Sequence, residues 1–177
     1  MKSSALLLFL GLAALPAWSL AAAPEADPGN ALRMFVGTWQ SHGSFSTPGA
    51  KKPKHMTGIN DCRWSGGTHL FLVCNGEAHV EGMAAPQYQL SVYTFDPVSK
   101  RYRFAVITPN QDVASPDFGL QGNTWSYSGK FTGKDGKTHW FRTLNIFDSP
   151  DHYRFEIQSS DDGDRWTTTG SGVSTRK

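Results

Sequence analysis

The sequence predicts an all-β protein: a single up-and-down antiparallel β-barrel of about ten strands, with a short helical turn at its N-terminal end. From Val36 onward, short alternating or apolar runs recur and no helical period is found. Turn sequences such as DPVSK, QGN and DDGD separate these runs. Closure of consecutive hairpins into a barrel removes exposed strand edges. A β-sandwich is the alternative.

The first 23 residues have the features of a secretory signal. Lys2 is their only charged residue, Ala5–Ala14 form an apolar core, and AWSLAAA offers small residues for cleavage. The apolar stretch is too short to span a membrane and ends at Pro16. We therefore expect the mature protein to be exported.

The remainder of the chain suits one domain. Residues 24–30 form a polar leader that we expect to be flexible, and 31–177 form the barrel domain. One or two helical turns are expected over residues 30–35, with Asn30 as their N-cap.

The turn signals divide the barrel domain into successive strands. We expect strands near 36–46, 54–64, 68–80, 87–95, 101–109, 113–120, 124–132, 137–147, 152–159 and 165–175.

The charge balance argues against polyanionic partners. There are 17 Lys and Arg residues against 15 Asp and Glu residues, and loss of Lys2 with the signal lowers the net charge of +2 by one. We therefore expect no nucleic acid and no acidic membrane surface as partner. The eleven Phe, six Trp and five Tyr residues provide ample material for an apolar interior.

The last hairpins allow cross-strand neighbours to be predicted. The turns place Trp125 opposite Leu144, Tyr127 opposite Arg142, and Leu144 opposite Phe155. A shift of one residue would move Arg142 to the outside. The face expected inside collects these residues: Trp125, Tyr127, Trp140, Arg142, Leu144, Ile146, Tyr153, Phe155 and Ile157.

Arg142 is the one charge predicted to point inward. An unpaired buried guanidinium is costly, so it should have a partner. One hypothesis is that it anchors the acidic head group of a ligand while aromatic side chains hold the apolar body. The alternative is an internal salt bridge or hydrogen bonds that fill the barrel. The predicted pocket residues are Trp39, Trp125, Tyr127, Trp140, Tyr153 and Phe155.

Four motifs in order resemble a known family. These are FVGTWQSHGSF, CRWSGGTHLFLVC, YTFDPVSKRY and SSDDGDRWTTTGSGVSTRK. Over Leu32–Lys177 the chain resembles bacterial secreted proteins of a domain-of-unknown-function family with a lipocalin-like (calycin-like) β-barrel. The resemblance implies this fold and export to the bacterial periplasm or the extracellular space, and no particular activity.

Two shorter motifs carry more distant resemblances. Gly37-Thr38-Trp39 is similar to the Gly-x-Trp opening of lipocalins, in which the Trp closes one barrel end. Nitrobindin, a haem-binding barrel, opens similarly with spaced glycines, but Ser41 and Phe45 interrupt that spacing here. SSDDGDRW is similar to the Asp-box, a structural turn.

Cys62 and Cys74 are the only cysteines. Export favours a disulfide, and the resembling family often carries both cysteines in this arrangement. A tight turn at Gly66 and Gly67 would leave them out of register, so the bridge requires a wider loop or a bulge. The alternative is two buried free thiols.

The histidines show no metal-binding pattern. His42 and His55 are expected to pair across strands on the outside, because Trp39 points inward. We expect no metal site and no bound cofactor, with haem ligation by a single histidine as the alternative. The histidines are His42, His55, His69, His79, His139 and His152.

The chain lacks the common catalytic motifs, which are a Gly-x-Ser-x-Gly elbow, a phosphate-binding loop and a metalloprotease helix. We therefore predict an exported, non-enzymatic barrel that binds a small apolar or amphipathic molecule. The alternatives are a haem-binding or isomerase-type barrel enzyme and a solidly packed structural barrel.

Overall fold

A computed structural model describes residues 28–46, 52–66, 69–109, 111–133 and 136–177. The predicted signal at 1–23 and most of the predicted leader lie outside the described residues. Within them, two short helical segments are followed by eleven strands. The strands are β1 (Gly37–Phe45), β2 (Lys54–Trp64), β3 (Leu72–Val80), β4 (Gln87–Asp96), β5 (Arg101–Thr108), β6 (Gln111–Ala114), β7 (Asp117–Gln121), β8 (Thr124–Thr132), β9 (Thr138–Ser149), β10 (His152–Ser160) and β11 (Thr167–Arg176).

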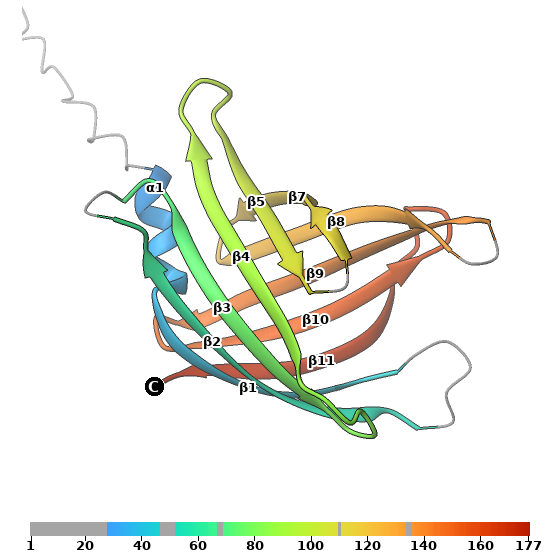
Figure 1. The fold of residues 1–177 in the computed structure, drawn as a ribbon. Helices are drawn as coiled ribbons and strands as arrows, with labels where there is room; N and C mark the ends of the chain where they lie inside the picture. Colours follow the sequence, from blue (N-terminus) through green and yellow to red (C-terminus); the bar gives the residue numbers. More distant parts are fainter. Residues whose placement is uncertain (1–27, 47–51, 67–68, 110, 134–135) are drawn as a thin grey trace, which may run out of the picture.

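All the strands belong to one antiparallel sheet that curls into a nearly closed barrel (Figure 1). The order is β6-β5-β4-β3-β2-β1-β11-β10-β9-β8-β7, so the first and last strands of the domain pair with each other. At the seam, β5 and β7 face each other through aromatic rings: Phe118 lies 5.7 Å from Phe104 and 6.1 Å from Tyr102, between ring centroids. The predicted all-β barrel is confirmed.

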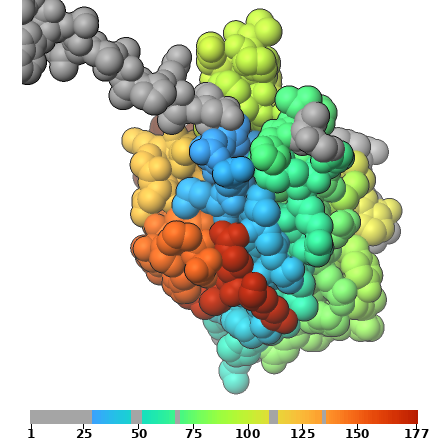
Figure 2. Space-filling view, turned by 90° about the vertical axis from the view of Figure 1, so that its left-hand side faces the viewer, coloured from blue at the N-terminus to red at the C-terminus, as the bar shows by residue number. Residues whose placement is uncertain are grey.

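The N-terminal helical segments cover one end of the barrel. They are α1 (Pro28–Ala31) and η1 (Leu32–Phe35), and in Figure 2 they lie in blue above the red C-terminal strand. Leu32 and Phe35 point inward and are buried. The helix begins two residues earlier than expected, so Asn30 lies within it. No helix among the described residues is long and apolar enough to cross a membrane.

Arg176 fastens this N-terminal segment to the end of the chain. Its guanidinium donates to the carbonyl oxygens of Val36 and Met34, and it packs over the Trp39 ring at 4.6 Å from the centroid. Its Nε lies 2.9 Å from Asp151 Oδ1. The Arg176 side chain thus binds carbonyl oxygens at the end of η1 that have no partner within the helix. It also packs on the Trp39 ring at the end of the barrel.

Two predicted strand boundaries are wrong. The strand expected at 113–120 is divided into β6 and β7, because Ser115-Pro116 interrupts the pairing and proline donates no ladder hydrogen bond. The strand expected from residue 68 begins at Leu72.

The predicted register of β9 is wrong by one residue. Tyr127 lies opposite Thr143, and Arg142 lies opposite Gln158. Pairing of Tyr127 with Arg142 would need an even number of residues in the connection between β8 and β9, which has five. The shift also separates the other predicted partners, since Phe155 and Trp125 both lie opposite Asn145.

The predicted pairing of His42 with His55 is also wrong. His42 lies opposite Thr57, and His55 lies opposite Ser44.

Candidate functional site

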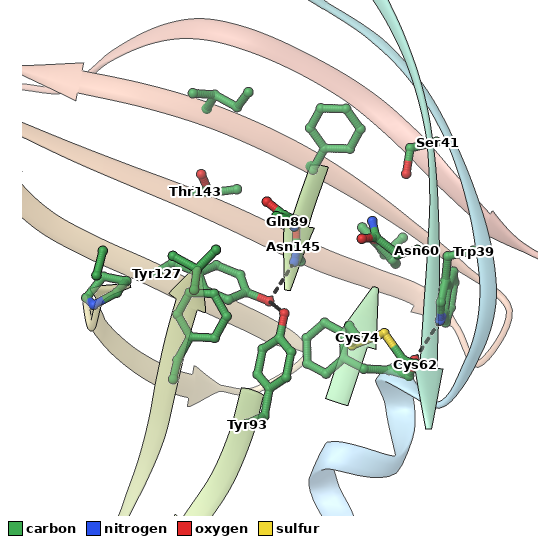
Figure 3. Close-up of a pocket in the computed structure, with 18 of the residues that line it drawn as sticks. Trp39, Ser41, Asn60, Cys62, Cys74, Gln89, Tyr93, Tyr127, Thr143 and Asn145 are labelled. Carbon is green, nitrogen blue, oxygen red and sulfur yellow. Dashed lines mark hydrogen bonds between the residues drawn. A yellow bond between two sulfur atoms is a disulfide. The ribbon is translucent and has the colours of Figure 1, made fainter. Parts of the chain in front are cut away.

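The barrel interior holds a cavity of about 390 Å³ that opens to solvent. The predicted alternative of a solidly packed barrel is therefore wrong. Figure 3 shows side chains from both halves of the sheet converging on this space. The lining residues are Phe35, Trp39, Ser41, Met56, Asn60, Cys62, Cys74, Gln89, Tyr93, Phe104, Val106, Ala114, Pro116, Tyr127, Phe141, Thr143, Asn145, Tyr153, Phe155 and Ile157.

The lining is aromatic and uncharged. Among the described residues that form it, there is no Asp, Glu, Lys, Arg or His. A charged group brought into this space would lose its hydration without gaining an opposite charge, which is strongly unfavourable. The cavity is therefore suited to neutral molecules.

The floor of the cavity is built on Phe35 and Trp39. Phe35 stacks on Tyr93 at 5.4 Å and meets Phe147 edge-on at the same centroid distance. The Trp39 indole N–H donates to the Phe35 carbonyl oxygen at 2.8 Å, and its ring packs 5.0 Å from that of Tyr153. Offset and edge-on ring contacts of this kind add to the free energy gained by burial.

On one wall of the cavity, strands β1 and β11 are paired through two glycines, and an aromatic ring packs against them. Gly43 lies opposite Gly172, and the Phe155 ring lies against both. A Cβ atom on Gly43 would stand 2.7 Å from Phe155 Cζ and 2.6 Å from the Ser171 carbonyl oxygen. Because both positions lack side chains, the ring lies along the wall instead of filling the cavity.

The deepest polar groups in the cavity bind one another. Asn145 Nδ2 donates to the Tyr127 hydroxyl at 3.2 Å, and the Tyr127 and Tyr93 hydroxyls lie 3.4 Å apart. Burial raises the pKa of Tyr93 to about 12, and burial also raises the pKa of Tyr127 well above its usual value. Both phenols therefore remain neutral hydrogen-bonding groups at physiological pH.

A second buried polar pair lies beneath Tyr153. The Ser41 and Ser174 hydroxyls are 3.0 Å apart and join β1 to β11. Burial raises the pKa of Tyr153, while hydrogen bonds from these serines act in the opposite direction. Tyr153 therefore also remains neutral.

Four of the predicted pocket residues line the cavity, and these are Trp39, Tyr127, Tyr153 and Phe155. Trp125 points inward but lies in the solid core beside the cavity. It is fully buried and stacked 4.8 Å from Phe118. The aromatic residues of β8 and β10 were thus predicted on the correct face.

Trp140 and Arg142 were predicted inside and lie outside. The Arg142 Nε donates to Gln158 Oε1 at 2.5 Å, and the guanidinium packs over the Trp166 ring at 4.3 Å. The Trp140 ring packs over Gly163 of the last turn. The one-residue register shift exchanges these side chains for Phe141, Thr143 and Asn145, so Arg142 does not line the cavity.

Cys62 and Cys74 form a disulfide and lie directly opposite each other on β2 and β3. A tight turn at Gly66 and Gly67 would have placed the two cysteines out of register, but the connection between β2 and β3 is longer than such a turn. Ser65 N–H donates to the Phe71 carbonyl oxygen at 2.8 Å, and β3 begins only at Leu72. Both cysteines line the cavity at its floor.

The histidines of the described part of the chain lie away from the cavity. His79 pairs with Glu77 and His152 pairs with Asp148, each on the outer surface. No group of three His, Cys, Asp or Glu residues in this part could hold a metal ion. The haem alternative through a histidine therefore has no donor among the described residues that line the cavity.

Sequence reasoning missed the polar residues of the opposite wall. Asn60 of β2 and Gln89 of β4 lie on the cavity, although isolated polar residues in a strand usually indicate its solvent face. Gly58 on β2 and Gly76 on β3 lie beside them on the same face of the sheet. They are the signal that could have identified a hollowed inner wall.

Comparisons with known proteins agree with this fold. Residues 26–176 match the model of a family described as "Protein of unknown function (DUF1579)". The search of curated proteins found no match. Rv2717c from M. tuberculosis aligns over 85% of this chain and 98% of its own, with 13% identity and a TM-score of 0.58. The S-type phycobiliprotein lyase CPES from Guillardia theta aligns over 84% and 91%, with 11% identity and a TM-score of 0.59.

Proposed function

The chain belongs to the DUF1579 family of proteins of unknown function, and we propose that it binds a small, uncharged, mainly apolar molecule inside its barrel. The observation that carries this proposal is a cavity of about 390 Å³ whose described lining is aromatic and has no charged side chain. This volume lies in the usual range for small-molecule sites, which is about 300–1,000 Å³.

The proposed role is binding without catalysis. The titratable side chains of the lining are the three buried tyrosines, and burial raises the pKa of each. General acid–base catalysis favours a group whose pKa lies near the working pH. The lining supports an apolar ligand instead, because burial of its surface supplies about 25 cal/mol per Å².

Filling the cavity should abolish binding. Thr143 lines the cavity, so Thr143→Trp should occupy the ligand's place and weaken binding of N-phenyl-1-naphthylamine at least tenfold. This neutral, apolar probe reports its own transfer from water by increased fluorescence. Leu144→Trp on the outer face of the same strand is the matched control and should bind like the wild type. Equal binding by both variants, each shown to be folded by circular dichroism, would contradict the proposal.

We also propose that the protein is exported. Residues 1–23 supply the signal features, and a Cys62–Cys74 disulfide suits an oxidising compartment. Mass spectrometry of the protein recovered from the periplasmic or culture fraction should find a mature N-terminus near Ala21–Ala23. Recovery of the full-length chain only from the cytoplasm would refute export.

A further inference from the structure

A small side pocket adjoins the cavity on the β2–β4 wall. Its volume is about 170 Å³, and it shares Ser41, Met56, Asn60 and Gln89 with the main cavity. Gly58, Gly76 and Ala78 form its back wall on β2 and β3. The pocket is too small for a whole ligand of the main cavity, but it is large enough for a head group.

The carboxamides of Asn60 and Gln89 lie close to Gly76 in this pocket. A Cβ atom at Gly76 would stand 2.5 Å from Asn60 Oδ1, 2.8 Å from Gln89 Cγ and 3.2 Å from Gln89 Nε2. An acceptor and a donor from strands on either side of β3 therefore lie close together above the glycine. A side chain at position 76 would displace at least one of these two carboxamides.

Neither carboxamide is hydrogen-bonded to another of the described residues. Asn60 is half-buried and Gln89 is exposed, so water can satisfy both while the site is empty. Asn145, by contrast, is buried and bonded to Tyr127. The deep polar groups are thus occupied by one another, and Asn60 and Gln89 remain available for a ligand.

The residues that line the side pocket disfavour an anion. Among the described residues that line it there is no cation, and the carboxylate of Glu77 pairs with His79 on the outer surface. A carboxylate would meet the Asn60 oxygen without a cation to balance its charge. It would also lack the hydrogen that the Asn60 oxygen could accept.

From these contacts we propose that the side pocket over Gly76 recognises a neutral head group carrying a hydrogen-bond donor and acceptor side by side, as an amide or lactam does. The N–H of this group donates to Asn60 Oδ1, and its carbonyl oxygen accepts from Gln89 Nε2. The apolar body of the same ligand fills the main cavity, so this inference rests on the proposed function.

Three matched probes test the head-group preference. They are 1-naphthaleneacetamide, 1-naphthaleneacetate and 1-ethylnaphthalene, which share an aromatic body and differ in the group attached to it. The wild type should bind the amide about tenfold more tightly than the carboxylate, as expected for two added hydrogen bonds and no charge burial. Isothermal titration calorimetry or the change in naphthalene fluorescence gives each affinity.

Removal of either carboxamide should erase that preference. Asn60→Leu and Gln89→Leu should each weaken amide binding about tenfold and leave 1-ethylnaphthalene binding within about twofold. Asn75→Leu, which removes an exposed carboxamide from the outer face of β3, is the matched control and should retain the preference.

The outcomes separate the two proposals. Wild-type protein that binds 1-ethylnaphthalene but does not prefer the amide overturns the head-group site alone. An amide preference that survives both Asn60→Leu and Gln89→Leu also overturns it. A wild type that binds none of the three probes overturns the proposed function, and the head-group site with it.

Discussion

Replacing Trp39 with alanine should lower the free energy of unfolding by about 3–5 kcal/mol, the usual cost of truncating a buried aromatic side chain. The indole is 1% exposed, and its N–H is bound to the Phe35 carbonyl oxygen. Its loss would also deprive Arg176 of the ring on which it packs. Because small domains are stable by only about 5–15 kcal/mol, the variant should lose a large part of its stability.

Urea denaturation followed by far-ultraviolet circular dichroism measures this effect. Trp39→Phe retains most of the packing and removes the hydrogen bond, so it should cost about 1–2 kcal/mol and stay measurable if Trp39→Ala does not fold. Trp166→Ala, which removes a half-buried indole from the outer face, is the control and should cost less than Trp39→Ala. Equal losses for Trp39→Ala and Trp166→Ala would show that Trp39 does not hold the barrel floor.

Loss of the disulfide should lower the free energy of unfolding by about 3 kcal/mol in the double variant Cys62→Ala/Cys74→Ala. The bridge joins residues 12 apart in sequence, and a loop of that size restricts the unfolded chain by roughly this amount. It also ties β2 to β3 at the cavity floor, where Cys62 is 4% and Cys74 2% exposed. We expect the variant to fold at room temperature and to unfold at a lower urea concentration.

Dithiothreitol supplies an independent measure of the same bond. The reductant should shift the wild-type unfolding midpoint toward that of the double variant and leave the variant itself unchanged. A wild-type midpoint that does not respond to reduction, in protein whose thiols are shown to be free, would contradict a stabilising role for the bridge.

The strands were predictable because the residues next to each strand mark where it begins and ends. The segment 54–64 matches β2 and 124–132 matches β8, since turn-forming residues flank each of them. The inward face of β8 also followed from alternation, because Trp125 and Tyr127 alternate with the small polar residues Ser126 and Ser128. Such signals need no knowledge of the rest of the chain.

The lining of β9 was not predictable in the same way. Trp140, Phe141, Arg142, Thr143 and Leu144 form a stretch in which both faces carry bulky groups. The choice depends on an odd number of residues in one turn and on a bulge between His152 and Tyr153, each of which shifts the register by one. These shifts decide whether the β9 face that contains Arg142 or the face that contains Asn145 points inward. The hydrophobic pattern of β9 is nearly the same for both faces.

The cavity lining was hard to predict for a related reason. Polar residues in a strand normally mark the side that faces water. Asn60, Gln89 and Asn145 belong to the inner face, because a hollow interior can solvate or pair a few polar groups. Binary patterning therefore identifies an inner surface but not whether that surface is packed or hollow.

The seam between β5 and β7 has a topological consequence. The strand order begins at β6 and ends at β7, and these two edge strands are consecutive in the chain, joined only through Ser115 and Pro116. If the chain were cut there and its original ends were connected, the new termini would lie on the two sheet edges and every strand ladder would remain whole. Such a circular permutant would convert the barrel's closure from a covalent one into a contact between aromatic side chains.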